Sequence, residues 1–384
     1  MRFLGLVVAA ALIGGCSSMG ETLDKVNPFS KSVPKIKPAE LTPIEATAQM
    51  RVLWQASVGK AGEFVFTPAV VGKSVYAAGR DGTLVRLDDG REVWRRSAGQ
   101  PLSGGIGSNG KLVVVGTIKG DVLAFEAETG RELWKARASS EVLAAPVVGD
   151  DLVVVRSGDS RIYGFDPADG RRRWGYQRAT PALTLRSNVG VALTERSILA
   201  GFPGGKLVAI SPANGAAMWE GAVALPKGAT ELERIADVTS APVPGSREVC
   251  AVAFQGRIAC FDQASGSGLW AREMSSRAGL AMDERSIYVS DDKGNVLAFV
   301  RESGASVWKQ DKLFMRALSR PLAVGSRVVV GDYQGVVHLL KRDDGAFAAR
   351  LNTDGSPISA DPLVIPGGFL VQTRNGGLFA IAVE

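Results

Sequence analysis

The stretch Gly120-Asp-Val-Leu-Ala-Phe-Glu-Ala-Glu-Thr-Gly-Arg-Glu-Leu-Trp134 decides the fold. Apolar and small residues alternate through its first half, a polar turn ends in Gly130, and a second strand carries the indole of Trp134. Glycine supplies the positive φ that a tight turn needs, and the acidic and hydroxyl side chains before it hydrogen-bond the local backbone. The stretch therefore predicts a β-hairpin.

The same hairpin recurs along the chain, because all seven tryptophans occupy its last position. They are spaced by 40, 40, 40, 45, 51 and 38 residues and are Trp54, Trp94, Trp134, Trp174, Trp219, Trp270 and Trp308. Six of them follow a glycine four residues upstream, namely Gly90, Gly130, Gly170, Gly215, Gly266 and Gly304. With the apolar run that precedes each hairpin, a unit of roughly 40 residues holds about four strands, which is typical of a β-propeller or a β-solenoid. We interpret the tryptophans as structural rings docked on the neighbouring sheet rather than as ligand-stacking surfaces.

The units add up to eight blades. Six complete units end at tryptophans, and a seventh runs through residues 335–345 with Ala349 in place of the ring. The eighth is divided between the two ends of the chain, because residues 369–381 stop before a tryptophan element and residues 51–54 are that element without a hairpin. We therefore predict an all-β, eight-bladed β-propeller of four-stranded antiparallel blades. An N-terminal strand that pairs into the last blade closes the ring and removes open sheet edges.

The N-terminal residues have the pattern of an export signal. A basic start precedes residues 3–13, which are apolar but too few to span a bilayer, and Ile13-Gly14-Gly15-Cys16 is similar to a bacterial lipobox. We predict a lipoprotein signal peptide at residues 1–15, acylation of Cys16 and a flexible, proline-containing tether at residues 16–48. The alternative is an ordinary secretory signal that contains a cysteine. Residues 49–384 would then form the propeller as one domain.

Charge and cysteine content narrow the partners and the compartment. The net charge is +6 with acidic and basic residues interspersed, so we expect no nucleic-acid binding. Cys250 and Cys260 flank an apparent turn at residues 255–256 and lie on adjacent strands of an exported chain. A cross-strand disulfide between them is our hypothesis, and two small buried thiols are the alternative.

The sequence contains no catalytic constellation. His338, the one histidine, lies in an apolar strand pattern, so we expect a core or edge residue rather than part of a Ser-His-Asp triad or a metal site. The carboxylates lie mostly in the repeating turns, where turn formation accounts for them. We therefore expect no enzyme activity, no metal and no cofactor.

Two neighbouring connections are longer than the others. The next hydrophobic strand begins 18 residues after Trp94 and after Trp134, but 24 residues after Trp174 and 30 after Trp219. Because these connections occupy equivalent places in adjacent blades, they should leave one face of the ring side by side. Unequal insertions on one face are typical of a binding surface.

Residues 124–134 resemble the tryptophan-docking motif of quinoprotein dehydrogenases, eight-bladed propellers that hold pyrroloquinoline quinone and calcium. The resemblance covers the blades only. Those enzymes are typically longer, and many carry two adjacent cysteines, which this chain lacks. A quinone enzyme is therefore one alternative function, and a structural scaffold of the cell envelope is another.

A resemblance over the whole chain is to the BamB family, lipoprotein subunits of the outer-membrane β-barrel assembly machinery, the BAM complex. It rests on the lipobox, the tether, the docking-type blades and two stretches within the enlarged connections, residues 181–186 and 229–242. Membership would imply a non-catalytic lipoprotein anchored at the periplasmic face of the outer membrane. It would bind the POTRA domains of BamA and assist the folding and insertion of outer-membrane proteins.

By this resemblance, the contacts to BamA fall on Leu183, Leu185, Arg186 and Asp237. The leucines would supply apolar contacts, the arginine a multidentate hydrogen-bonding anchor and the aspartate an acidic group. Thr239 stands where the family has a second aspartate, so the acidic half of the contact differs from the family pattern. The alternative is that both leucines are core residues of an inner strand. Exposed strand edges could also pair with unfolded outer-membrane protein precursors.

Overall fold

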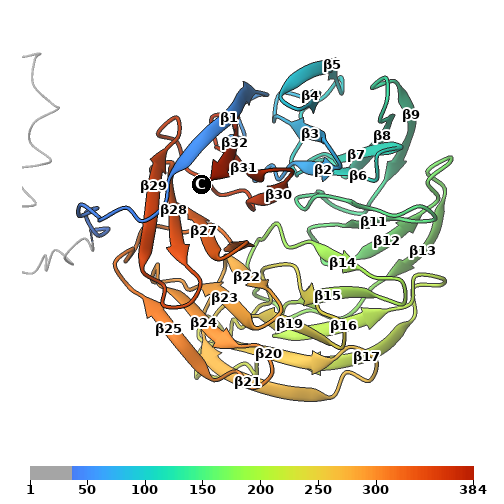
Figure 1. Cartoon of the computed structure of the whole chain (residues 1–384). Coiled ribbons are helices and arrows are strands. Elements are labelled where there is room, and N and C mark those ends of the chain that lie inside the picture. Colours follow the sequence, from blue (N-terminus) through green and yellow to red (C-terminus); the bar gives the residue numbers. More distant parts are fainter. Residues whose placement is uncertain (1–36) are drawn as a thin grey trace, which may run out of the picture. The chain divides into compact units, whose positions relative to one another are not determined.

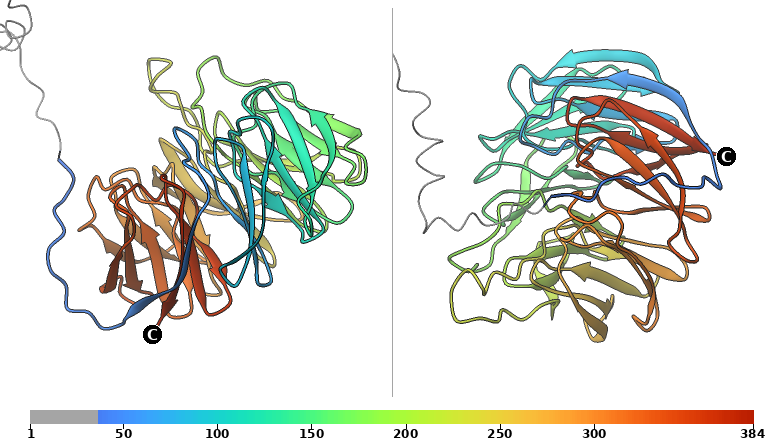
Figure 2. Two further views of the ribbon diagram at one scale, coloured as in Figure 1. Left: turned by 90° about the horizontal axis from the view of Figure 1, so that it is seen from above. Right: turned by 90° about the vertical axis from the view of Figure 1, so that its left-hand side faces the viewer.

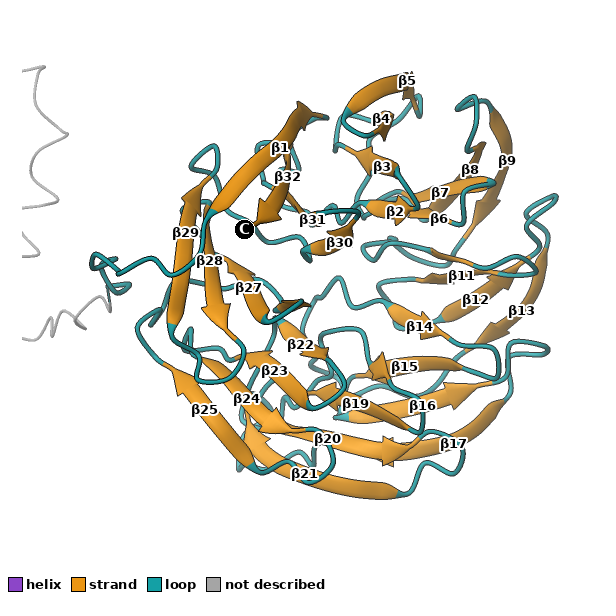
Figure 3. Cartoon of the chain, in the orientation of Figure 1, coloured by secondary structure: helices purple, strands orange, loops and turns teal. Residues whose placement is uncertain are grey.

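The computed structural model describes residues 37–384, so Cys16, the predicted signal peptide and most of the predicted tether lie outside the described residues. All regular elements in the described part are strands, 32 of them in eight four-stranded sheets (Figure 1, Figure 3). Within residues 37–384 there is no helix of the length and hydrophobicity needed to cross a membrane. The predicted eight-bladed, antiparallel propeller is confirmed.

We number the blades along the chain and name the strand nearest the ring centre first (Figure 1). Blade 1 consists of β2 (Ala69–Val71), β3 (Ser74–Ala78), β4 (Thr83–Asp88) and β5 (Arg91–Ser97), and blade 2 of β6 (Gly107–Ser108), β7 (Leu112–Gly116), β8 (Asp121–Glu126) and β9 (Glu132–Arg137). Blade 3 consists of β10 (Val147–Val148), β11 (Val153–Arg156), β12 (Ile162–Phe165) and β13 (Arg172–Tyr176). Blade 4 consists of β14 (Val191–Leu193), β15 (Ile198–Phe202), β16 (Lys206–Ile210) and β17 (Ala217–Ala222). Blade 5 consists of β18 (Val243–Pro244), β19 (Glu248–Val252), β20 (Gly256–Asp262) and β21 (Gly268–Met274), and blade 6 of β22 (Gly279–Met282), β23 (Ser286–Ser290), β24 (Val296–Val300) and β25 (Ser306–Gln310). Blade 7 consists of β26 (Leu322–Val324), β27 (Arg327–Gly331), β28 (Val336–Lys341) and β29 (Phe347–Asn352). Blade 8 consists of β30 (Leu363–Ile365), β31 (Gly368–Gln372), β32 (Gly377–Val383) and β1 (Met50–Ser57).

The core lies between neighbouring blades. In blade 2, all five residues of β7 are buried, because both faces of this middle strand are covered by adjacent sheets. The outer strand β9 has one residue in the buried class, Trp134. Continuous apolar runs therefore form the middle strands, and polar sequences with one indole form the outer ones.

The indoles join each blade to the next. The Trp134 ring lies against the Gly170 turn of blade 3, and its Nε1–H donates to the carbonyl oxygen of Pro167 at 2.8 Å. Gly170 has φ +72°, and a Cβ there would lie 2.5 Å from an atom of the Trp134 ring. Both the backbone conformation and the contact with the ring therefore require glycine at this position. Equivalent bonds run from Trp94 to Ala127, Trp174 to Pro212, Trp219 to Gln263, Trp270 to Arg301 and Trp308 to Arg342.

The ring closes as the sequence predicts. Strand β1 pairs antiparallel with β32, so the outermost strand of blade 8 comes from the N-terminal end of the propeller and the other three from the C-terminal end. Met50 lies opposite Val383 and Ser57 opposite Gly377. The split blade therefore contains no open edge between its two halves.

The compact unit includes residues 38–48, which we call the N-terminal strap. The Ala39 amide donates to the Phe314 carbonyl at 2.9 Å, and the Thr47 amide donates to the Ala348 carbonyl at 2.9 Å. The last part of the predicted tether is thus packed on blades 6 and 7, and the propeller unit starts before residue 49. A tether sequence can do this because the strap is held largely through backbone groups, which every residue carries.

Blade 5 contains the cysteine pair. Cys250 in β19 faces Cys260 in β20 across the ladder, and both side chains are fully buried. The structure joins them by a disulfide with an S–S distance of 1.96 Å. The bond therefore links two adjacent strands within one blade rather than two blades.

Candidate functional site

The two enlarged connections leave the same face of the ring. Because neighbouring strands are antiparallel, each segment that joins one blade to the next leaves the sheet at the same end as the loop between the second and third strands. We call this end of the propeller the loop face. The connection from blade 3 to blade 4 covers residues 177–190, the one from blade 4 to blade 5 covers residues 223–242, and both extend beyond the strand ends (Figure 2). Their adjacency agrees with the expectation from the tryptophan spacing.

The first enlarged loop presents an apolar and cationic segment. Leu183 is 43% exposed, Leu185 is half-buried, and neither lies in a strand. The alternative that they are core residues of an inner strand is therefore excluded. The Arg186 side chain is 58% exposed, and its Nε lies 3.4 Å from an oxygen of Glu141. We call Leu183, Leu185 and Arg186 the loop-face patch.

Glu141 is a weak competitor for the arginine of this patch. The pKa of the Glu141 carboxyl lies below its ordinary value, first because the Ser140 hydroxyl donates to it, and Arg186 adds to the effect. The carboxylate is therefore ionised at neutral pH. An ion pair this exposed contributes little to stability, so Arg186 can exchange Glu141 for a carboxylate of a partner at small cost.

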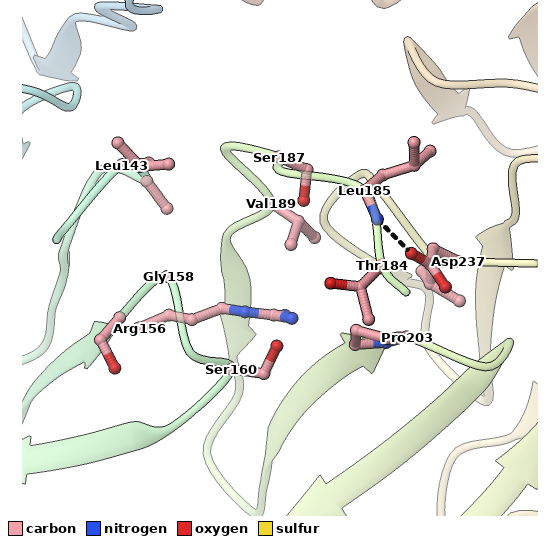
Figure 4. A pocket seen from close by; sticks show the side chains of 13 residues that line it. Leu143, Arg156, Gly158, Ser160, Thr184, Leu185, Ser187, Val189, Pro203 and Asp237 are labelled. Atoms are coloured by element: carbon pink, nitrogen blue, oxygen red, sulfur yellow. Dashed lines mark hydrogen bonds between the residues drawn. The ribbon is translucent and has the colours of Figure 1, made fainter. Parts of the chain in front are cut away.

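Asp237 differs from its expected role. Its side chain is only 2% exposed, so it does not present an acidic group at the surface. Instead one carboxylate oxygen accepts the Leu185 amide at 2.7 Å (Figure 4). The other carboxylate oxygen accepts the Gly204 amide at 3.0 Å. A buried carboxylate needs such donors, and here the donors belong to the other enlarged loop and to blade 4. Asp237 therefore fixes the backbone of the loop-face patch.

Arg156 is a member of this site that the sequence did not single out. It is buried, lines the same small hollow as Asp237, donates to the Gly201 carbonyl and has its guanidinium carbon 5.0 Å from the Phe202 ring centre. Burial lowers its pKa to about 10, against the opposing charge of Asp237, so it remains a cation at neutral pH. The sequence did contain a sign that Arg156 is unusual. Among the second strands of the described blades, only β11 ends in a charged residue, which is Arg156.

The hollow around these two groups is too small to be a ligand pocket. Arg156 and Asp237 line a cavity of about 20 Å³ (Figure 4). That volume corresponds to about one water molecule. Arg156 and Asp237 therefore belong to the support of the loops through their own backbone partners, and the exposed surface of the loops is the candidate site.

A larger hollow of about 910 Å³ opens at the loop-face end of the central channel. Its carboxylates are already engaged. Asp292 accepts from Arg277 at 3.1 Å, and Asp361 accepts from Arg320 at 3.2 Å. Asp291 accepts the backbone amides of its own turn.

The donor set of the channel does not fit a calcium–quinone centre. Within residues 37–384, no group of three or more His, Cys, Asp or Glu side chains is arranged to hold a metal ion. The two cysteines described are paired with each other on adjacent strands and are not neighbours in sequence. His338, expected in the core or at an edge, is fully buried in blade 7, where its Nε2 lies 2.9 Å from Asp332.

Comparisons with known proteins agree on one family. The family described as outer membrane protein assembly factor BamB matches residues 80–310. A relative of that name from Bordetella pertussis is 45% identical over 98% of this chain and 96% of its own length. Another from Burkholderia pseudomallei is 42% identical over 89% of this chain and 90% of its own length.

Solved structures show the same fold. The crystal structure of BamB from Moraxella catarrhalis superposes with a TM-score of 0.81 at 27% identity, over 87% of this chain and all of that one. A quinohemoprotein alcohol dehydrogenase from Comamonas testosteroni reaches a TM-score of 0.68 at 12% identity, over 86% of this chain and 76% of its own, which is a likeness of fold alone. The full-length relatives are assembly factors rather than enzymes. The chain therefore belongs to the BamB family of outer membrane protein assembly factors.

Proposed function

We propose that the protein is a non-catalytic scaffold lipoprotein of the BAM complex that binds the POTRA domains of BamA through the loop-face patch. In this role it assists the folding and insertion of outer-membrane proteins. The observation that carries the proposal is the loop-face patch, with Leu183 and Arg186 exposed and Leu185 half-buried, whose backbone is fixed by the buried carboxylate of Asp237.

The chemistry of the patch suits a protein partner. A leucine that stays 43% exposed on a fixed loop loses little conformational freedom on binding, which favours affinity. Arg186 adds five N–H donors in a planar fork, which can bind a carboxylate or backbone carbonyls of the partner. Apolar anchors next to an arginine are a common composition of binding hot spots.

The location is part of the same proposal. Cleavage before Cys16 and acylation of its thiol would anchor the protein in the outer membrane with the propeller on the periplasmic side. A protein that carries an ordinary secretory signal in place of residues 1–15 and alanine at position 16 should be extracted from membranes by salt more readily than the lipidated protein, since it has neither acyl chains nor an apolar signal as an anchor.

The first prediction is that Leu183→Ala combined with Arg186→Ala weakens the binding of BamA. The two changes remove one apolar and one cationic anchor, so we expect capture to fall by about tenfold or more. The measurement is the amount of BamA that co-purifies with the lipidated protein from detergent-solubilised outer membrane, followed by titration of the purified partners.

A matched control replaces an exposed leucine and an exposed arginine elsewhere on the propeller. Leu133 and Arg131 lie in blade 2, are 40% and 67% exposed, and are away from the enlarged loops. Leu133→Ala with Arg131→Ala should leave capture unchanged, and both double variants should unfold at the temperature of the native protein. Undiminished capture by the loop-face variant would refute the proposal, and co-purification with cell-wall proteins alone would favour a structural role in the envelope.

A further inference from the structure

The tip of the 223–242 loop is a preformed helical turn. The Thr230 hydroxyl accepts the Glu233 amide at 3.2 Å, while the Glu233 carboxylate accepts the amides of Ala229 and Thr230 at 2.8 and 3.1 Å. This reciprocal arrangement is a capping box, which stabilises the first turn of a helix. The backbone amides of Thr230 and Ala229 lower the pKa of the Glu233 carboxyl, so the cap is intact at neutral pH.

The other charged groups of the tip are also satisfied within it. Arg234 donates from Nε to the Gly228 carbonyl at 3.0 Å, and its terminal nitrogen pairs with Glu231 at 3.2 Å. These contacts are exposed and individually weak. Together with the capping box they hold one backbone shape without any partner.

The turn presents a leucine to solvent. Leu232 is 68% exposed, which is the largest value for a large hydrophobic side chain among the described residues. A single exposed leucine is ordinary on a protein surface. What distinguishes this one is its place at the centre of a capped turn, on a loop whose base residues Ala236 and Val238 are each 1% exposed in the core between blades 4 and 5.

We propose that Leu232 is an apolar knob that inserts into an apolar socket on the same POTRA surface that receives the loop-face patch. The inference rests on the proposed function and adds a second contact region to it. The continuity of the two regions supports the choice of partner, because Asp237 lies five residues after Leu232 and is hydrogen-bonded to the Leu185 amide. The two enlarged loops are therefore fixed relative to each other and can engage one rigid partner together.

The test separates the side chain from the shape that presents it. Leu232→Ala should weaken the binding of BamA by the lipidated, full-length protein by about five- to tenfold, because an apolar anchor is lost. Glu233→Ala keeps the leucine but breaks the capping box, and should weaken binding by about two- to fivefold because the turn must be ordered on binding. Leu269→Ala, at a 53% exposed position in β21, is the matched control and should leave affinity unchanged.

Cross-linking identifies the occupant of the turn. A cysteine-reactive photo-cross-linker attached to the Leu232→Cys protein in the intact BAM complex should give a product with BamA. A product with a second copy of this chain, a product only with unfolded precursors, or no product would each overturn the inference. If Leu183→Ala with Arg186→Ala reduces capture while the Leu232 and Glu233 variants do not, the proposed function stands and the knob fails; if neither set reduces capture, both fail.

Discussion

At the residue scale, a buried ionic cluster in blade 7 links the core to the N-terminal strap. Arg316 is 2% exposed, and Asp332 and His338 are fully buried. One oxygen of Asp332 accepts from Arg316 Nε at 2.7 Å and lies 2.9 Å from His338 Nε2, and the other oxygen accepts the Gln334 amide at 2.9 Å. Arg316 also donates to the Ala39 carbonyl at 2.9 Å. The carboxylate is thus satisfied on both oxygens, as a buried charge requires.

The pKa values in this cluster predict acid sensitivity. Burial lowers the pKa of His338 below its ordinary 6.5, although the Asp332 carboxylate favours the charged ring. Burial opposes the ionisation of Asp332, but the hydrogen bond of His338, the charge of that ring once it is protonated at low pH, and further donors outweigh it and lower the pKa of the carboxyl. The folded state therefore holds a neutral imidazole beside a carboxylate, with Arg316 and Arg350 as the nearby cations.

The second prediction concerns stability below neutral pH. As the pH falls below about 6.5, the unfolded chain binds a proton at His338 that the folded chain does not, so the free energy of unfolding should fall by at most about 1.4 kcal/mol per pH unit. The loss from Asp332 begins only below its ordinary value of 3.8. Urea unfolding between pH 7.5 and 5 measures the slope. Because the chain has one histidine, His338→Gln should make the free energy of unfolding nearly independent of pH in this range. An unchanged slope in that variant would mean that groups other than His338 cause the loss of stability.

At the element scale, the junction between two blades is a ring on a glycine turn. The third prediction compares two glycines with nearly the same backbone, Gly170 at φ +72° and Gly99 at φ +70°. An alanine at either position must adopt the left-handed conformation, but only at Gly170 would its Cβ meet the Trp134 ring, at 2.5 Å. Gly170→Ala should therefore lower the free energy of unfolding by about 1–3 kcal/mol more than Gly99→Ala. Equal losses in urea unfolding would mean that the indole yields and does not fix the spacing of the blades.

The blade count could be predicted from the sequence because each junction needs particular residue types. A positive φ in contact with an indole admits only glycine, and seven of the eight blade junctions contain this contact, so both residue types recur at similar intervals along the sequence. The positions of the enlarged loops could be predicted for the same reason, as departures from this spacing. The tryptophan missing at Ala349 marked the blade next to the closure of the ring.

The inward role of Asp237 could not be predicted in the same way. Its hydrogen-bond partner is a backbone amide 52 residues away, at Leu185, and any residue supplies such an amide. The packing of the strap on the propeller could not be predicted for a similar reason. Ala39 and Thr47 bind through backbone groups, which leave no periodic pattern in the sequence. Side-chain identity predicts contacts that depend on side chains, whereas contacts made by the backbone require the folded chain.

At the scale of the whole molecule, the ring has one junction unlike the others. Seven glycine turns lie against an indole of the preceding blade, from Gly90 on Trp54 round to Gly345 on Trp308. The junction of blade 7 with blade 8 has Ala349 in place of the ring, and blade 8 has no turn there because β32 and β1 are separate ends of the propeller. The junction that lacks the indole is therefore also the one that lacks the glycine turn, and it lies where β1 closes the ring.

The strap and the two residues that follow it, Gln49 and Met50, supply contacts next to this junction. The backbones of Gln49 and Glu384 exchange hydrogen bonds of 3.1 and 2.9 Å, which extend the closing ladder by one pair. Ala48 and Met50 pack against the core shared by blades 7 and 8, and Leu41 packs against the core of blades 6 and 7. Arg350 reaches from β29 to a strap carbonyl. We infer that the strap replaces part of the stabilisation that an indole supplies elsewhere.

The fourth prediction tests this by shortening the chain from its N-terminal end. A chain that begins at Lys37 should unfold like the native protein, because the strap is complete. A chain that begins at Thr47 loses the Ala39 and Leu41 contacts but keeps β1, so it should remain a closed ring that is less stable by about 1–3 kcal/mol, with faster hydrogen exchange in β28 and β29 than in blades 2 and 3. A chain that begins at Val58 lacks β1, leaves the β32 edge open and should aggregate. If the chain from Thr47 matches the chain from Lys37 in both stability and exchange, the strap is a passive covering and closure depends on β1 alone.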